Sequence, residues 1–313
     1  MITDVKVSRK AVLSGHNGPV YALETGNQPG TVYSGSSDRI IAQWNLEKPG
    51  DGSQIAKSTE IIYALLNVET INKLLVGLST GTIHVLNQLT AIEERQLNYH
   101  QSPVFCLVKS ERNNLIFSLS GDGELGLIDL NTLQLENKLL LGNFKLRAAA
   151  LTPDEKLLAV GSGSGAVFIF SLPDMKPVKH WQAHQENFSV NALTFTNDGE
   201  LLLTGSRDAY LNVYEVKNNF NLLNAIPAHN YAIYSIVFNP QGNLFATGSR
   251  DKTVKIWNTE TFKVLKRIDS DTTGGHVNSV NKLLWHQETD LLVSAGDDRS
   301  VLVWDVKPVY SNE

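Results

Sequence analysis

The sequence predicts an all-β protein, a seven-bladed β-propeller with four antiparallel strands in each blade. Three observations predict it: a short phrase recurs seven times, the interval between phrases is nearly constant, and residues within them alternate as strand residues do. The phrases are SGSSDRIIAQWN, VGLSTGTIHVLN, SLSGDGELGLIDL, VGSGSGAVFIFS, TGSRDAYLNVYE, TGSRDKTVKIWN and SAGDDRSVLVWD. The chain is therefore one repeat array.

One turn residue anchors each phrase, and successive anchors are 42, 42, 42, 44, 43 and 47 residues apart. A period of this length is typical of propeller blades, each of which is one four-stranded sheet. We expect residues 1–313 to form a single domain. The anchors are Asp38, Thr80, Asp122, Ser164, Asp208, Asp251 and Asp298.

A tight turn is expected between the second and third strands of each blade. Segments on both sides, such as residues 31–34 and 253–257, alternate β-branched or aromatic residues with small or polar ones, and helical periodicity is absent. Three anchors are followed by Gly81, Gly123 and Gly165, which supply the positive φ that such turns require.

The two ends of the chain indicate how the ring closes. Only eight residues follow Asp305, too few for another turn and a well-paired outer strand, while residues 5–13 precede the first blade with no other assignment. A closed ring leaves no exposed sheet edge. We therefore predict that Val5 to Leu13 forms the outer strand of the last blade.

Composition narrows the class of protein. Hydrophobic residues make up 42% and charged residues 19%, and the formal charge of -5 argues against binding nucleic acid. Cys106 is the only cysteine, so the chain can form no internal disulfide and no cysteine-based metal site. The N-terminus has no apolar signal segment and no window is long enough to span a membrane. We expect a cytoplasmic protein.

Further residues recur at fixed positions in the repeat. Six residues after each anchor stands Trp44, Leu86, Ile128, Phe170, Tyr214, Trp257 or Trp304. Upstream of five anchors stands a histidine: His16, His100, His184, His229 or His276. In this combination of His, Asp, Trp and period, nearly the whole chain resembles the WD-repeat (WD40) family of β-propellers.

The resemblance implies a buried hydrogen-bonded set of His, Ser/Thr, Asp and Trp in a complete blade. Blades three and five have Ile128 and Tyr214 in place of Trp, and blades two and four have Val76 and Val160 in place of Ser/Thr, where we expect apolar packing. The complete sets are His16, Ser34, Asp38 and Trp44 in blade one; His229, Thr247, Asp251 and Trp257 in blade six; and His276, Ser294, Asp298 and Trp304 in blade seven.

Enzyme motifs are not supported in detail. The recurring His, Ser and Asp could suggest a catalytic triad, but a set repeated in five blades indicates a structural device rather than one nucleophile beside an oxyanion pocket. Residues 121–126 match G-x-G-x-x-G, yet they form the third blade's turn and lack the strand–helix context. His84, His180 and His286 are scattered. We expect no catalytic residue, no bound metal and no cofactor.

The resemblance also implies where a partner would bind. In this family the narrow face commonly receives peptides through two positions per blade, one early in the innermost strand and one just before the Asp of the second turn. Aromatic side chains could hold an apolar or cationic group, and arginines could pair with a carboxylate or phosphate. The residues carried over as partner-binding are Tyr21, Tyr63, Phe105, Arg147, Asn191, Arg207, Tyr234, Arg250 and Asn281.

Three functions stay open. The leading hypothesis is a non-catalytic scaffold that binds a protein or peptide, as a monomer or as a subunit of a complex. The alternative from another class is a hydrolase or lyase with a site at the channel mouth, where Asp297 is the single carboxylate among the positions aligned. The third is a structural spacer without a specific peptide site. An exposed Phe188 in the loop before blade five would favour binding.

Overall fold

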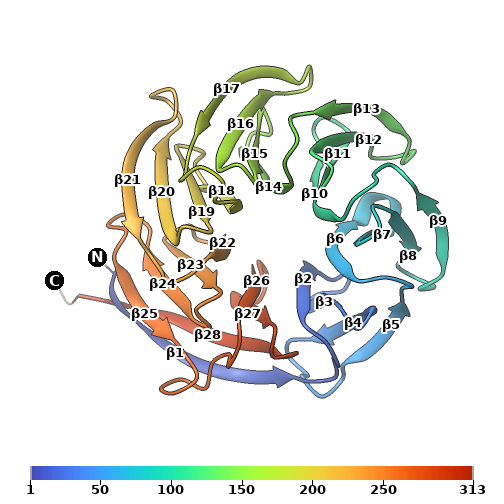
Figure 1. Ribbon diagram of the computed structural model, residues 1–313. Helices are drawn as coiled ribbons and strands as arrows, with labels where there is room; N and C mark the ends of the chain where they lie inside the picture. The colour runs from blue at the N-terminus through green and yellow to red at the C-terminus, as the bar shows by residue number, and fades with distance from the viewer. Residues whose placement is uncertain (1, 312–313) are drawn as a thin grey trace.

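The computed structural model describes residues 2–311, so Met1 and residues 312–313 of the predicted domain lie outside the described part. Seven four-stranded antiparallel sheets stand around a central axis (Figure 1), which confirms the predicted seven-bladed propeller. Within the described residues the one helical element is a short 3-10 turn, η1 (Glu69–Ile71). No helix among them is long and apolar enough to cross a membrane.

Each blade runs from an innermost to an outermost strand. The innermost strands are β2 (Val20–Thr25), β6 (Ile62–Val68), β10 (Val104–Ser110), β14 (Leu146–Leu151), β18 (Val190–Phe195), β22 (Ile233–Phe238) and β26 (Val280–Trp285). The second strands are β3 (Thr31–Ser36), β7 (Lys73–Leu78), β11 (Leu115–Ser120), β15 (Leu157–Ser162), β19 (Leu201–Ser206), β23 (Leu244–Ser249) and β27 (Leu291–Gly296).

The third strands are β4 (Ile40–Asn45), β8 (Ile83–Asn87), β12 (Glu124–Asp129), β16 (Ala166–Ser171), β20 (Tyr210–Glu215), β24 (Val254–Asn258) and β28 (Val301–Tyr310). The outermost strands are β5 (Ser53–Lys57), β9 (Glu93–Leu97), β13 (Leu135–Leu140), β17 (Lys176–Gln182), β21 (Asn221–Pro227), β25 (Val264–Ile268) and β1 (Ile2–Leu13). The turns between second and third strands lie on one face, which we call the narrow face.

The ring is closed by the N-terminal strand, as predicted. β1 pairs antiparallel with β28, from Ile2 opposite Tyr310 to Leu13 opposite Val301, and the two strands run side by side in Figure 1. The strand begins at Ile2, three residues earlier than predicted. Val5 and Leu13 are buried, so β1 contributes to the core as well as to the hydrogen-bond ladder.

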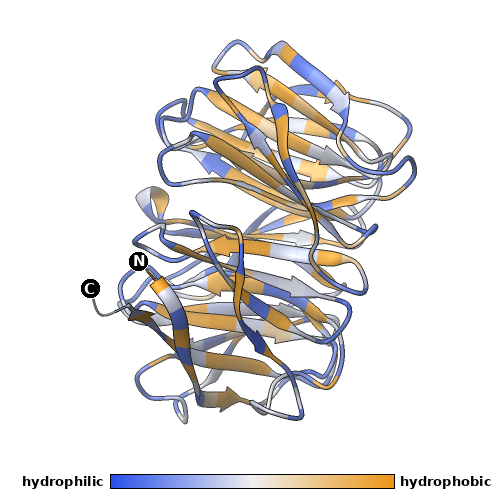
Figure 2. Ribbon diagram, turned by 90° about the vertical axis from the view of Figure 1, so that its left-hand side faces the viewer, coloured by the Kyte–Doolittle hydropathy of each residue, from blue (hydrophilic) through white to orange (hydrophobic). Residues whose placement is uncertain are grey.

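The core lies between neighbouring blades. One cluster joins blades six and seven through residues such as Leu244, Ile256 and Trp304, and hydrophobic residues run along the strands in Figure 2. Close approach of blades requires glycine at one point of the second strand: a Cβ at Gly205 would lie 2.6 Å from Ile233 Cγ2. Each blade therefore buries its face only against its neighbours.

The narrow-face turns adopt positive φ in all seven blades. Gly81, Gly123 and Gly165 take it up as predicted. The other four blades place a non-glycine residue there, for example Arg39 (φ 72) and Lys252 (φ 73), although a side chain makes this conformation costly.

Candidate functional site

The innermost strand of every blade carries a β-bulge at the same point. In blade one the register passes from Val20 to Ala22, and the residue between them has no partner in the ladder. A bulge re-aims the side chain of the extra residue. The seven residues at the bulges are Tyr21, Tyr63, Phe105, Arg147, Asn191, Tyr234 and Asn281.

These seven bulge residues line one pocket of about 360 Å³ at the narrow-face mouth of the channel. Arg250, Ser279, Lys282 and Asp297 complete its lining. The structure thus brings together eight of the nine residues that the sequence analysis assigned to partner binding. Arg207, the ninth, does not line this pocket.

Along blades one to four the pocket wall is a continuous row of flat side chains in contact, which we call the aromatic wall. The Tyr21 and Tyr63 rings are stacked with centroids 5.2 Å apart, and Tyr63 and Phe105 follow at 5.4 Å. The guanidinium of Arg147 lies 4.1 Å from the centroid of the Phe105 ring. All four side chains are half-buried, so each keeps one part open to the pocket.

Two members of the pocket also join neighbouring blades. Asn191 donates from Nδ2 to the carbonyl of Ile233 at 3.3 Å, and Asn281 donates to the carbonyl of Val20 at 3.1 Å. Asn281 Nδ2 also donates to Asp297 Oδ1 at 2.7 Å. Burial, followed by the charge of Asp297, raises the pKa of Tyr21, so this hydroxyl stays protonated at neutral pH.

Two further arginines of the narrow face lie over aromatic rings from the preceding loop. Arg207 stands 5.7 Å from the centroid of the half-buried Phe188 ring, and Arg250 stands 5.9 Å from the Tyr231 ring. Tyr231 is 59% exposed. Both arginines immediately precede the anchor aspartate of their blade, so their backbone lies at equivalent positions in the two narrow-face turns.

The anchor aspartates are held by the polar sets that the resemblance implied. In blade six, Trp257 Nε1 donates to Thr247 Oγ1 at 2.9 Å. His229 then bridges two residues: its Nε2 lies 2.7 Å from Thr247 Oγ1, and its Nδ1 lies 2.9 Å from Asp251 Oδ2. Backbone N–H of Asn230 donates to the same carboxylate at 3.1 Å. The network is consistent with a neutral His229 that donates to Asp251 from Nδ1.

The complete sets of blades one and seven repeat this geometry. His16 lies 3.0 Å from Asp38, and Trp44 donates to Ser34 at 2.8 Å. In blade seven the corresponding bonds join His276, Asp298, Ser294 and Trp304 at 2.8–2.9 Å. Each set ties the loop before a blade to its narrow-face turn.

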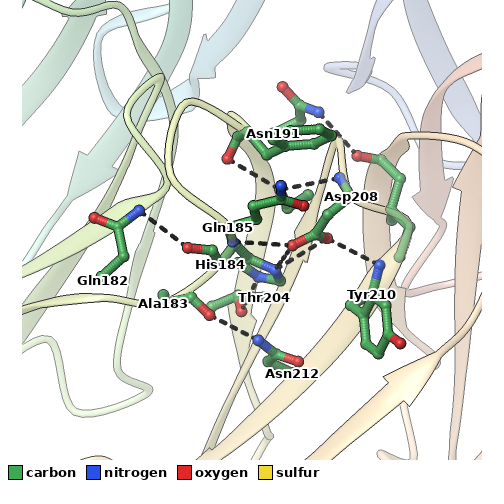
Figure 3. A network of polar contacts seen from close by, with 12 residues as sticks. Gln182, Ala183, His184, Gln185, Asn191, Thr204, Asp208, Tyr210 and Asn212 are labelled. Carbon is green, nitrogen blue, oxygen red and sulfur yellow. Dashed lines mark hydrogen bonds and ion pairs between the residues drawn. The ribbon is translucent and has the colours of Figure 1, made fainter.

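The partial sets of blades three and five differ from the complete ones because Ile128 and Tyr214 replace Trp. In blade five His184 still contacts Thr204 at 2.8 Å and Asp208 at 3.0 Å (Figure 3), while the Tyr214 hydroxyl donates to the carbonyl of Ala183 instead. The network therefore survives the loss of Trp with its last link redirected.

In blade three His100 keeps Ser118 at 2.8 Å, but its Nδ1 stands 3.4 Å from Asp122 and makes no hydrogen bond. Glu124 adds a second carboxylate beside it, and within residues 2–311 this is the one group with metal-ligand composition. Lys138 already pairs with Glu124, so a cation is supplied by the chain itself. We assign no metal site there.

The electrostatics of the sets follow from burial and hydrogen bonding. Burial alone would raise the pKa of Asp298, but hydrogen bonds from His276 and Ser300 outweigh it and lower the value to about 2. The same balance lowers the pKa of Asp251, and burial lowers that of His229. These aspartates are charged and His229 is neutral at neutral pH, so they hold structure rather than exchange protons.

A second chamber of about 400 Å³ lies deeper in the channel and shares Tyr63, Phe105 and Lys282 with the narrow-face pocket. Its lining mixes apolar side chains with polar ones, among them Glu24 and Lys282. Burial raises the pKa of Glu24 to about 7. This carboxyl is therefore partly protonated at neutral pH.

Sequence reasoning did not assign Glu24, Tyr231 or Lys282 to the site, whereas it had placed Asp297 at the channel mouth. For Glu24 a signal existed, because the matching positions of blades two to four hold Leu66, Val108 and Ala150. Glu24 is the one charged residue among these four positions, and it lines the chamber.

Comparisons with known proteins agree with this architecture. The family model for the WD domain, G-beta repeat, matches residues 7–45, 175–215, 220–258 and 269–305. The chain is 24% identical over 247 residues to Actin-interacting protein 1 of Drosophila melanogaster, which covers 66% of this chain and 40% of that protein.

Two other relatives show the same level of similarity. Autophagy-related protein 18 of Dictyostelium discoideum is 24% identical over 50% of this chain and 43% of its own length. Periodic tryptophan protein 2 of Arabidopsis thaliana is 25% identical over 83% of this chain and 28% of its own length. The matched regions thus span less than half the length of these relatives.

Proposed function

Because this chain belongs to the WD-repeat β-propeller family, we propose that it is a protein-interaction scaffold that grips an extended segment of a partner at the narrow-face pocket. Propellers of this family generally act as non-catalytic platforms. Actin-interacting protein 1 carries a binding partner in its name, and the partner of the present chain is taken to be a protein as well.

The observation that carries the proposal is the convergence of seven bulge residues on one pocket. Regular pairing would alternate these side chains with their neighbours along the strand, whereas the bulge turns all seven toward the channel mouth. Four of them are aromatic and half-buried, and aromatic side chains with one free face are favoured at binding surfaces.

The enzyme alternative finds less support in the same pocket. Hydrolysis or elimination needs a base and an acid that converge on one reacting atom. Asp297 is the carboxylate in the lining, and it already accepts a hydrogen bond from Asn281. The pocket favours holding a ligand over transforming it.

The test is affinity capture from the native cell with wild-type protein and the variant Tyr21→Ala/Tyr63→Ala/Phe105→Ala. We expect the variant to lose the wild-type partners while its melting temperature changes little, since these side chains are outside the interblade core. A matched control is Leu89→Ala/Ile92→Ala, which removes two exposed apolar side chains from the opposite face.

Unchanged capture by the aromatic variant would remove this face from consideration. Loss of capture by the control alone would move the contact to the opposite face. A wild-type protein that captures nothing above background would instead favour a structural spacer.

A further inference from the structure

We propose that the narrow face selects partner segments with acidic side chains, through a row of three arginines on blades four to six: Arg147, Arg207 and Arg250. The inference deepens the proposed function and rests on it. The recognised chemistry is a carboxylate or a phosphate ester on the partner.

Each of the three guanidinium groups lies over an aromatic ring of this chain. The distances to the ring centroids are 4.1 Å for Arg147 over Phe105, 5.7 Å for Arg207 over Phe188 and 5.9 Å for Arg250 over Tyr231. A cation–π contact needs no hydrogen bond to an acceptor atom, so the guanidinium N–H groups remain available to a ligand.

The same three groups form no ion pair or hydrogen bond among the residues that the structure describes. Arg147 is half-buried, and its Nε has no hydrogen-bond partner. Elsewhere Arg95 and Arg112 donate to backbone carbonyls, at 2.8 and 3.0 Å. Arg207 and Arg250 are exposed, so the guanidinium donors of all three arginines remain available to an acceptor from a partner.

The polar sets fix the backbone that carries two of these arginines. Arg207 precedes Asp208, which His184 holds at 3.0 Å, and Arg250 precedes Asp251, which His229 holds at 2.9 Å. Each histidine also lies at the start of the loop that carries the aromatic partner, Phe188 after His184 and Tyr231 after His229. A row held in place before binding loses less conformational entropy when a ligand arrives.

Charge at the pocket is opposite in sign to that of the whole chain. The formal net charge is -5, yet the pocket lining contains Arg147, Arg250 and Lys282 against Asp297 alone. A local positive patch on a negative protein steers acidic segments to this place and disfavours basic ones.

The experiment uses the full-length protein and three fluorescent pools of short peptides with random flanking residues around a fixed pair of Glu, phosphoserine or Lys. Fluorescence polarisation at low ionic strength measures binding. We expect the Glu or phosphoserine pool to bind at least about ten-fold more tightly than the Lys pool, with the difference shrinking as salt is added.

Two variants locate the effect. Arg147→Gln/Arg207→Gln/Arg250→Gln should reduce acidic-pool affinity by about ten-fold or more, whereas Arg95→Gln/Arg112→Gln/Lys176→Gln removes equal charge elsewhere and should change it less than about two-fold. Circular dichroism and melting temperature confirm that both variants are folded.

The outcomes separate the two proposals. Tighter binding of phosphoserine than Glu assigns a phosphate, and the reverse assigns a carboxylate. Equal or tighter binding of the Lys pool overturns acid selection but leaves the scaffold proposal to the capture experiment. Absence of binding by every pool, or equal losses of affinity in both variants, also overturns the proposal that the three arginines select acidic segments. The scaffold proposal fails separately, if the Tyr21→Ala/Tyr63→Ala/Phe105→Ala variant still captures the wild-type partners.

Discussion

Blade six and blade four hold the same narrow-face turn by different means. In blade six the residue at positive φ is Lys252, and the turn is tied to the preceding loop through Asp251, His229 and Thr247. The Asp251 carboxylate also accepts the backbone N–H of Thr253 at 3.1 Å. The hydrogen bonds of this polar set therefore offset the conformational cost of Lys252 at positive φ.

In blade four Gly165 occupies the strained position, where the absence of a side chain removes most of the cost. Val160 is fully buried in place of the hydroxyl residue, and the Ser162 hydroxyl bonds locally, to Ser164 at 2.7 Å and to the carbonyl of Ala166 at 2.9 Å. The difference teaches that the ring requires a common backbone rather than common chemistry. Blade six is vulnerable to the loss of one polar atom, and blade four is not.

Both kinds of blade depend on ring closure, so the largest effect is expected from deleting residues 2–12. The deletion removes the outer strand of blade seven, exposes the edge of β28 and takes Val5 from the core. We expect loss of soluble protein or a fall in melting temperature of more than about 15 °C. A deletion variant that melts near the wild-type temperature would contradict the closed ring.

The second effect tests the comparison itself. Thr247→Val leaves the Trp257 N–H and His229 Nε2 without partners in a buried site and should lower the free energy of unfolding by about 2–4 kcal/mol. The reciprocal Val160→Thr places a hydroxyl in an apolar site and should cost about 1–3 kcal/mol. Denaturant titration measures both. If Thr247→Val costs less than about 0.5 kcal/mol, the polar set does not hold blade six.

The smallest effect is a difference in acid sensitivity. A histidine in the unfolded chain takes up a proton near pH 6.5, whereas burial lowers the pKa of His229 in the folded protein. The stability of the fold therefore decreases as pH falls from about 6.5 toward the lowered pKa of His229. Asp298, with a pKa of about 2, contributes above pH 3.8 and loses this as pH falls toward 2.

Blade four has no such set, so its amides should keep their protection on acidification. We expect hydrogen-exchange protection factors in β24 to fall about ten-fold more than those in β16 between pH 7 and pH 4, the range in which His229 acts. Equal losses in both strands would show that the polar set of blade six does not govern its acid sensitivity.

Much of the fold could be predicted because the repeat supplies seven independent readings of one pattern. The blade count follows from the anchors, and closure follows from counting the residues that remain at each end. The start of β1 at Ile2 could not be predicted, since residues 2–4 pair with β28 at a partly exposed edge and carry no strong pattern.

The candidate site was less accessible to sequence reasoning. The family resemblance pointed to the bulge positions, but a bulge has no sequence signature in these strands, whose extra residue is Tyr, Phe, Arg or Asn. Arg207 and Arg250 occupy equivalent positions, yet Arg250 lines the pocket and Arg207 does not, and the sequence gives no signal for this difference.

The pairing of β1 with β28 also determines how the molecule responds to force. Ile2 faces Tyr310 at one end of the ladder, so tension applied through the two termini pulls adjacent strands apart from that end. The bonds would then break in succession, like a zipper, rather than all at once in shear. Mechanical load carried by attached segments would open blade seven first and leave blades two to five intact until the ring had parted.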